Sequence, residues 1–285
     1  MIELYTDILS KAEKAAGEGN DLNSVLEILR ELPLEDFGLF FVNLPDRNYP
    51  HLSKLLPPMA AVDTQKKWTG TSGLELYRQT ALFLRIVESN VARHRQRGLQ
   101  DSTILDFGVG YGRIFRMMYY FSNPEKLWGV DAWQRSLDFC KAANMAGNFA
   151  LSDSVPESLP VGDVKFDLMV SFSVFTHLEP ETAKTCLRAL RKHIAPDGLL
   201  MATIRPIEFW RFYDGLKQTD NASRLEKAHR ENGFAYLPHE GAQGATYGDT
   251  SFVPEYLIES SGWRCLAVDR SIADPYQVTC VLSPV

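Results

Sequence analysis

The stretch Ile104-Leu105-Asp106-Phe107-Gly108-Val109-Gly110-Tyr111-Gly112-Arg113 decides the fold of this chain. Its beginning, with Thr103 just before it, is short and mainly apolar, which is typical of a strand buried on both faces. Three glycines follow at alternate positions, and a helix is expected directly after them. Glycines remove the Cβ atoms that would keep a ligand away, and a helix start offers unpaired backbone N–H groups. We therefore expect a ligand-binding turn between a strand and a helix.

Short apolar runs alternate with helical segments from this point onward, which is the pattern of β/α units around a parallel sheet. We predict strands at 103–107, 126–130, 148–151, 166–172 and 199–204, followed by two closing strands at 263–269 and 277–282. Helices are expected at about 112–121, 132–146 and 180–194. The segment 206–251 interrupts this pattern. It is polar, and we expect one helix in it, near 222–231, with a further short helix at 253–261.

The N-terminal part has a different character. Helical spacing of apolar residues predicts helices at about 2–16 and, after a cap at Asp21, from residue 22 to about 33. The segment 36–58 is apolar but contains four prolines, so it is expected to be irregular and packed. A loop at 66–73 then leads into a long helix.

Composition limits the kind of protein. The chain has 285 residues, of which 45% are hydrophobic and 23% charged, so it can bury a sizeable core. Its net charge is −6, and it therefore lacks the excess of basic residues expected of a nucleic-acid-binding face. The four cysteines form no C-x-x-C pair and indicate buried thiols in a reducing compartment rather than a metal site. The start of the sequence does not resemble a signal peptide, and no apolar run is long enough to span a membrane. We expect a cytoplasmic protein with no metal, no nucleic-acid partner and no membrane partner.

The spacing of the glycines points to one family. Dinucleotide-binding folds have G-x-G-x-x-G, whereas this turn is G-x-G-x-G, with Arg113 where the last glycine would stand. Together with Asp106, it resembles motif I of the class I S-adenosylmethionine-dependent methyltransferases. The resemblance covers roughly Leu76 to Val285. It implies a Rossmann-like α/β sheet of seven strands with the last one antiparallel, in a domain at 73–285. The remainder would be a helical N-terminal cap at 1–72 and a substrate-side insert at 206–251.

The resemblance also implies where the cofactor, S-adenosylmethionine, and its product S-adenosylhomocysteine would bind. The glycines would pass under the methionine part, Asp131 would hold the ribose hydroxyls, Ala132 and Trp133 would lie beside the adenine, and Asp153 would bind the adenine amino group. The full set of expected cofactor residues is Thr69, Gly70, Asp106, Gly108, Gly110, Gly112, Arg113, Asp131, Ala132, Trp133, Ser152, Asp153, Ser171 and Phe172.

Simpler interpretations stay open for several of these residues. Asp131 would be favoured at a helix start without any ligand, and Asp153 could form an Asx turn. Arg113 could pair with a carboxylate of the cofactor or with Asp106. Trp68, Thr69 and Gly70 are expected to be lid residues, but Trp68 could equally be a core residue.

The loop after the fourth strand bears on the methyl acceptor. It contains none of the motifs that mark amino-methylating or cytosine-methylating nucleic-acid enzymes, protein-arginine enzymes or metal-dependent catechol enzymes. The run Ser173-Val174-Phe175-Thr176-His177-Leu178 instead resembles bacterial methyltransferases that act on small molecules, lipids and glycans. His177 is the expected catalytic residue, as a general base, although a histidine that merely fixes the loop is slightly preferred. Arg205, His239 and Tyr247 are expected to contact the acceptor.

The sequence therefore predicts an enzyme that transfers a methyl group directly to a small-molecule, lipid or glycan acceptor. Two alternatives remain: an aminopropyltransferase-like enzyme on the same fold, and a non-catalytic module that binds the cofactor. We also expect the N-terminal residues and the insert to form a mostly helical cap over the carboxyl edge of the sheet. Neither the acceptor, the atom methylated nor the oligomeric state follows from the sequence.

Overall fold

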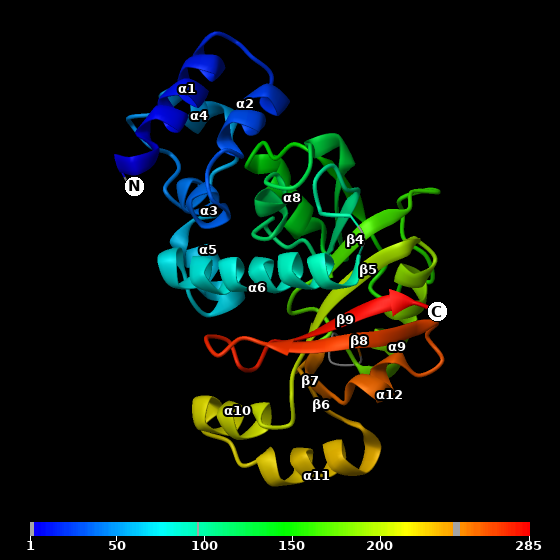
Figure 1. Cartoon of the computed structure of the whole chain (residues 1–285). Helices are drawn as coiled ribbons and strands as arrows, with labels where there is room; N and C mark the ends of the chain where they lie inside the picture. The colour runs from blue at the N-terminus through cyan, green and yellow to red at the C-terminus, as the bar shows by residue number, and fades with distance from the viewer. Residues whose placement is uncertain (1–2, 96, 242–245) are drawn as a thin grey trace. The chain divides into compact units, whose positions relative to one another are not determined.

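The strands of the computed structural model give the predicted methyltransferase-type sheet (Figure 1). The structure describes residues 3–95, 97–241 and 246–285. Seven strands lie in the order β3-β2-β1-β4-β5-β9-β8. Their bounds are β1 (Ile104–Phe107), β2 (Leu127–Asp131), β3 (Asn148–Leu151), β4 (Phe166–Ser171), β5 (Ile194–Ile204), β8 (Trp263–Arg270) and β9 (Val278–Pro284). β1 pairs with β2 and β4 with β5 in parallel, whereas β9 runs antiparallel to both β5 and β8. The expectation of a seven-stranded sheet with an antiparallel last strand is confirmed.

The chain divides into two compact units, which we describe separately. The first consists of Met1–Arg85 and Leu99–Ala150, and the second of Ile86–Gly98 and Leu151–Val285. The predicted boundary at residue 72 stays a prediction. Among the described helices, none is both long and apolar enough to cross a membrane.

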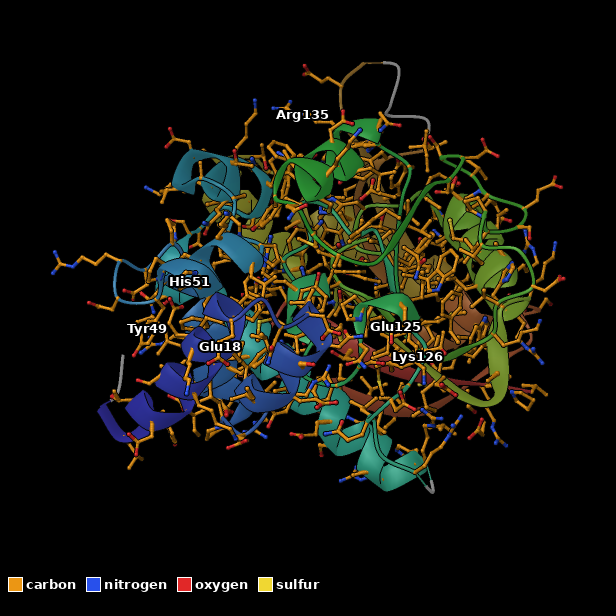
Figure 2. All side chains as sticks on the ribbon, turned by 90° about the horizontal axis from the view of Figure 1, so that it is seen from above. Glu18, Tyr49, His51, Glu125, Lys126 and Arg135 are labelled. Atoms are coloured by element: carbon orange, nitrogen blue, oxygen red, sulfur yellow. The ribbon has the colours of Figure 1, made fainter. Side chains whose placement is uncertain are left out.

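The first unit begins with the helices α1 (Thr6–Gly17), α2 (Leu22–Leu29), α3 (Leu34–Val42), α4 (Pro50–Leu55), α5 (Val62–Thr69) and the start of α6 (Gly73–His94). Of these, α1, α2 and α6 were predicted. Asp21 caps α2 by accepting the Ser24 N–H at 2.8 Å. The Glu13 carboxylate of α1 accepts the backbone N–H groups of His51 and Leu52, both at 2.9 Å, and so caps α4 from a neighbouring helix. Figure 2 labels His51, at the start of α4, and Glu18, directly after α1, within this helical part of the chain. The same unit also contains α7 (Phe115–Met118) and α8 (Gln134–Ala142).

Two expectations for the N-terminal part were wrong. The segment 36–58 is not irregular, because α3 and α4 occupy much of it. Pro33 immediately precedes α3 and Pro50 is the first residue of α4, where a missing N–H costs nothing. Phe37, Phe40 and Phe41 then repeat at helical spacing and are buried. The first half of the loop expected at 66–73 is helical and forms the end of α5. Gly70 terminates this helix with φ of 79°.

The second unit holds the remaining helices and a second small sheet. α9 (Pro180–Arg191) is capped by Glu179, which accepts the Thr182 N–H at 3.0 Å. α11 (Ala222–Asn232) and α12 (Pro254–Ile258) match expectation. The sequence did not predict α10 (Phe209–Lys217) or the antiparallel pair β6 (Phe234–Pro238) and β7 (Gly248–Phe252). They form because Phe209, Trp210, Leu225 and Ala235 bury one another in a core of their own within the insert.

Candidate active site

The glycine turn lies in the first unit, directly after β1. Gly108, Gly110 and Gly112 have φ of 82°, 56° and 76°, a left-handed backbone that favours glycine. The N–H groups of Gly108 and Val109 both donate to the Val130 carbonyl, at 2.8 and 3.1 Å, which ties the turn to the end of β2. The turn predicted from the glycine spacing is therefore present.

The missing Cβ atoms of two of these glycines face different surroundings. A Cβ at Gly112 would lie 2.4 Å from Met145 Cε and 3.4 Å from Cys140 Sγ, so this glycine allows close packing against side chains of the same unit. A Cβ at Gly110 would meet only the ring of Trp68, at 3.7 Å. Gly110 is thus the position at which the turn leaves room for a ligand, and the cofactor role expected of Gly112 stays a prediction.

Asp131 is joined to this turn across 21 residues of sequence. Its Oδ2 accepts the Gly110 N–H and its Oδ1 accepts the Trp133 N–H, both at 2.9 Å. Burial raises the pKa of Asp131, while these two donors oppose that change. Trp133 is 41% exposed, beside the half-buried Ala132. The carboxylate and the glycines that were assigned to one site thus lie in contact.

Asp106 is buried beneath the turn, with 3% of its surface exposed. Its Oδ2 has no hydrogen-bond partner among the side chains and backbone that the structure describes. Burial raises the pKa of Asp106 to about 7, and the nearby Arg113 charge opposes this rise. Arg113 donates to Gln79 Oε1 at 2.8 Å and to Thr80 Oγ1 at 3.0 Å. Asp106 is therefore a buried acid with a free oxygen and a cation close by.

The segment expected to act as a lid presents Trp68 to the turn. Its ring centroid lies 5.9 Å from that of Tyr111, 6.2 Å from that of Trp133 and 5.5 Å from that of Phe139, each in an edge-to-face arrangement. The Thr69 hydroxyl is within hydrogen-bond distance of the carbonyls of Gln65 and Thr71, and it also lies close enough to Tyr111 to oppose the rise that burial causes in the pKa of that tyrosine. Trp68 and Thr69 therefore both approach the turn, and cofactor binding by Thr69 and Gly70 stays a prediction.

The other expected cofactor residues belong to the second unit. Ser152 is buried and Asp153 exposed after β3. Ser171, at the end of β4, is fully buried and its Oγ has no partner within the described part of the chain, while Phe172 is half-buried. Their roles toward a cofactor stay predictions.

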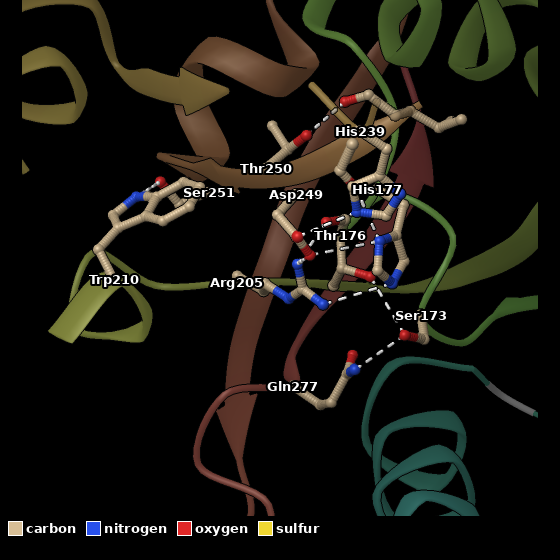
Figure 3. Close-up of polar contacts among 12 residues, drawn as sticks. Ser173, Thr176, His177, Arg205, Trp210, His239, Asp249, Thr250, Ser251 and Gln277 are labelled. Atoms are coloured by element: carbon tan, nitrogen blue, oxygen red, sulfur yellow. Dashed lines mark hydrogen bonds and ion pairs between the residues drawn. The ribbon is translucent and has the colours of Figure 1, made fainter. Parts of the chain in front are cut away.

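Arg205, His177 and His239 meet around Asp249 in the second unit (Figure 3). Tyr247 joins them through ring contacts with both histidines, and we call these five residues the Asp249 cluster. Arg205 forms a buried ion pair with Asp249 and donates to the Thr176 carbonyl at 3.0 Å. His239 Nε2 lies 3.1 Å from Asp249 Oδ2, and the Tyr247 ring stacks on His177 at 5.1 Å. The cluster therefore unites one residue expected to be catalytic with the three expected to contact the acceptor.

The hydrogen bonds of His177 fix its protonation state. Arg205 Nη2 can only donate, so His177 Nε2, 3.3 Å away, accepts. Nδ1 then carries the proton and donates to the Gly248 carbonyl at 2.7 Å. Burial, and then the Arg205 charge, lower the pKa of His177 to about 4. These contacts make His177 a neutral side chain that joins its loop to β7, and its role as a general base stays a prediction.

The same contacts bear on metal binding. One nitrogen each of His177 and His239 and one oxygen of Asp249 lie within 4.8 Å of one another, close enough for a metal-binding set. Arg205 already supplies a positive charge to Asp249 and an N–H to His177. A divalent cation would have to compete with that guanidinium for both residues, so the described contacts favour Arg205 as the cation of this cluster.

Sequence reasoning missed a polar chain next to the Asp249 cluster. Ser173 has φ of 61°, and its N–H donates to Thr203 Oγ1 at 2.7 Å. Its hydroxyl lies 3.2 Å from Thr176 Oγ1 and accepts from Gln277 Nε2 at 3.0 Å. Gln277 Oε1 is buried without a partner among the described residues. The left-handed backbone at a non-glycine residue follows from no sequence pattern, and Gln277 lies 104 residues further along the chain, just before β9.

Part of this chain matches a known family model, and several solved structures are similar to it. Residues 104–198 match the family model of a methyltransferase domain. Among solved structures, the chain is similar to an S-adenosylmethionine-dependent methyltransferase from Clostridium acetobutylicum, with a TM-score of 0.50 and 12% identity over 78% of this chain and 96% of that one. It is also similar to DesVI from Streptomyces venezuelae, with a TM-score of 0.50 and 13% identity over 80% and 99%. A protein from Pyrococcus horikoshii gives a TM-score of 0.50 at 15% identity over 73% and 91%. These likenesses show a shared fold, and the family model identifies residues 104–198 as similar to a methyltransferase domain.

Proposed function

We propose that this protein transfers a methyl group from S-adenosylmethionine to a small-molecule, lipid or glycan acceptor. The contact between Asp131 Oδ2 and the Gly110 N–H, at 2.9 Å, carries the proposal. It places a carboxylate at the glycine turn, and each carboxylate oxygen has a second lone pair with which to accept from a ribose hydroxyl. A nucleoside held there would have its sugar on Asp131 and its chain over Gly110.

The residues around the turn suit that cofactor. Gly110 leaves open space apart from Trp68, and the unpartnered Oδ2 of Asp106 offers a buried acceptor beneath the turn. S-adenosylmethionine supplies a methyl group that is already electrophilic, because it is bonded to a positively charged sulfur. The protein's task is therefore to hold donor and acceptor in line and to keep water out.

The state of His177 bears on the acceptor. A general base needs a free lone pair, and that of His177 Nε2 accepts from Arg205. Asp249 is likewise engaged by the Arg205 guanidinium. The cluster therefore favours an acceptor that arrives without its proton, such as a free amine, over a hydroxyl group that needs a base. Arg205, His239 and Tyr247 would hold that acceptor rather than activate it.

Two other functions remain open. An aminopropyltransferase would need acidic side chains for a polyamine; residues 171–177 contain none, and Asp249 is neutralised by Arg205. A non-catalytic module would bind the cofactor and turn nothing over. Transfer of a labelled methyl group to a panel of amines and alcohols separates the proposed enzyme from both.

Calorimetric titration of the full chain with S-adenosylmethionine and S-adenosylhomocysteine tests the cofactor directly. We expect dissociation constants in the micromolar range, which corresponds to about −8 kcal/mol. A folded protein that gives no heat and no thermal shift with either compound would refute the proposal.

A further inference from the structure

We propose that the indole of Trp68 contacts the positively charged sulfur of S-adenosylmethionine and makes the site prefer this cofactor over its neutral product. The inference rests on the proposed function, because it requires the cofactor to cross Gly110. It concerns a residue of the first unit alone.

Trp68 is held in place from both ends of α5. Gln65 is 4% exposed; its Nε2 donates to the Ala60 carbonyl at 2.6 Å and its Oε1 accepts the Gly73 N–H at 2.9 Å. The same side chain thus ties the segment before α5 to the start of α6. A helix of this length has little stability of its own, so these bonds decide where its side chains point.

A second tie joins the approach to α5 to the glycine turn itself. The Arg116 guanidinium is fully buried and donates from Nη2 to the Pro58 carbonyl at 3.1 Å and to the Tyr111 carbonyl at 3.3 Å. Tyr111 stands between Gly110 and Gly112. The backbone that carries Trp68 and the backbone that would carry the cofactor are therefore fastened to one cation.

The position of the indole follows from these ties. Two carbons of its six-membered ring lie 3.7 and 3.8 Å from the place where Gly110 would carry a Cβ, and no other heavy atom comes within 4 Å among the contacts described. Tyr111, Trp133 and Phe139 stand around it in edge-to-face contacts. A ligand that crosses Gly110 must consequently pass in contact with an aromatic ring.

An aromatic face attracts a cation through its quadrupole, as in the recognition of quaternary ammonium groups. The sulfur of S-adenosylmethionine is positively charged, whereas that of S-adenosylhomocysteine is neutral after the methyl group has left. Contact with Trp68 would therefore stabilise the bound substrate and not the bound product, and release of the product would be favoured.

The test compares the full-length protein with Trp68→Leu, Trp68→Phe and Trp133→Leu by calorimetric titration with both compounds. Trp68→Leu is expected to weaken S-adenosylmethionine by about 2- to 30-fold and S-adenosylhomocysteine clearly less. Trp68→Phe keeps an aromatic face and should preserve most of the preference. Trp133→Leu is the comparison at the neighbouring ring, which contacts Trp68 and is expected beside the adenine, so it should weaken the binding of both compounds without a selective loss for S-adenosylmethionine.

Three results would overturn the inference. If Trp68→Leu weakens the binding of both compounds equally, Trp68 contacts a part of the molecule that the two compounds share. Tighter binding of both would mean that the indole fills the site and must be displaced. If the unaltered protein binds neither compound, the proposed function fails and the role of Trp68 fails with it. Circular dichroism confirms folding of each variant, and Trp68→Phe tests the preference even if the leucine variant does not fold.

Discussion

Oδ2 of Asp131 accepts the backbone N–H of Gly110 at 2.9 Å, and this bond joins the end of β2 to the glycine turn. Because the other oxygen accepts the Trp133 N–H, the carboxylate organises two stretches of backbone at once. Its importance therefore extends from the proposed ribose contact to the shape of the site.

Asp131→Ala should weaken S-adenosylmethionine and also destabilise the fold. Loss of a hydrogen-bonded acceptor for a hydroxyl costs on the order of 1–3 kcal/mol of binding, and the N–H groups of Gly110 and Trp133 lose their partner as well. We expect a dissociation constant raised by about 5- to 150-fold and a lower free energy of unfolding. Calorimetry and urea denaturation measure the two effects. Asp131→Asn is the control, because one oxygen remains. An unchanged dissociation constant would place the ribose partner elsewhere.

The glycine pair separates packing from binding. Gly112→Ala puts a Cβ against Met145 at 2.4 Å, so we expect a loss of about 1–3 kcal/mol in the free energy of unfolding. Gly110→Ala meets only Trp68 at 3.7 Å, and its main structural cost is the left-handed φ of 56°, about 1 kcal/mol. Relative to the stability that each variant loses, Gly110→Ala should weaken the binding of S-adenosylmethionine more than Gly112→Ala does. The reverse ranking in paired denaturation and calorimetry experiments would contradict this assignment.

The sequence predicted the sheet well because the β/α pattern and the glycine turn are local. The strand at 148–151 was predicted with the bounds that β3 has, and β9 lies antiparallel as expected. α10 was missed because Phe209 and Trp210 are buried only once Leu225 and Ala235 pack on them, a contact between distant segments. For the same reason the sequence suggested His177 but not its state, since Arg205, Gly248 and Asp249 reach it from elsewhere in the chain.

The His177 side chain should remain neutral well below the pH at which a histidine ordinarily becomes protonated. Burial and the Arg205 charge lower the pKa of His177 to about 4, whereas in the unfolded chain it titrates near 6.5, the ordinary value for histidine. The unfolded state binds the proton more readily, so this contribution to stability is complete above pH 6.5 and is lost as the pH falls towards 4. Nuclear magnetic resonance of the ring protons measures the titration. Urea denaturation measures the free energy of unfolding at pH 7 and at pH 5. The difference between these two values should be smaller for His177→Gln than for the unaltered protein. Titration of His177 near pH 6.5 would contradict the Arg205 contact.

The Arg205–Asp249 pair allows a test of how strongly the cluster depends on its own charges. The two side chains are 11% and 8% exposed, and Arg205 also lies 4.0 Å from the centre of the Phe209 ring. Asp249→Asn leaves a buried guanidinium without its counter-charge, and we expect a loss on the order of 3–5 kcal/mol in the free energy of unfolding. The double variant Arg205→Met with Asp249→Leu removes both charges and should be clearly more stable than Asp249→Asn, because no unpaired charge is left behind.

The matched control is Glu35→Gln, which breaks the ion pair between Glu35 and Arg85. These two side chains are 47% and 46% exposed, so the loss in the free energy of unfolding should be less than about 1 kcal/mol. Urea denaturation at pH 7 compares all three. A loss at Asp249 as small as that at Glu35 would show that the pair is accessible to water in solution, and that Arg205 is free to bind an acceptor directly.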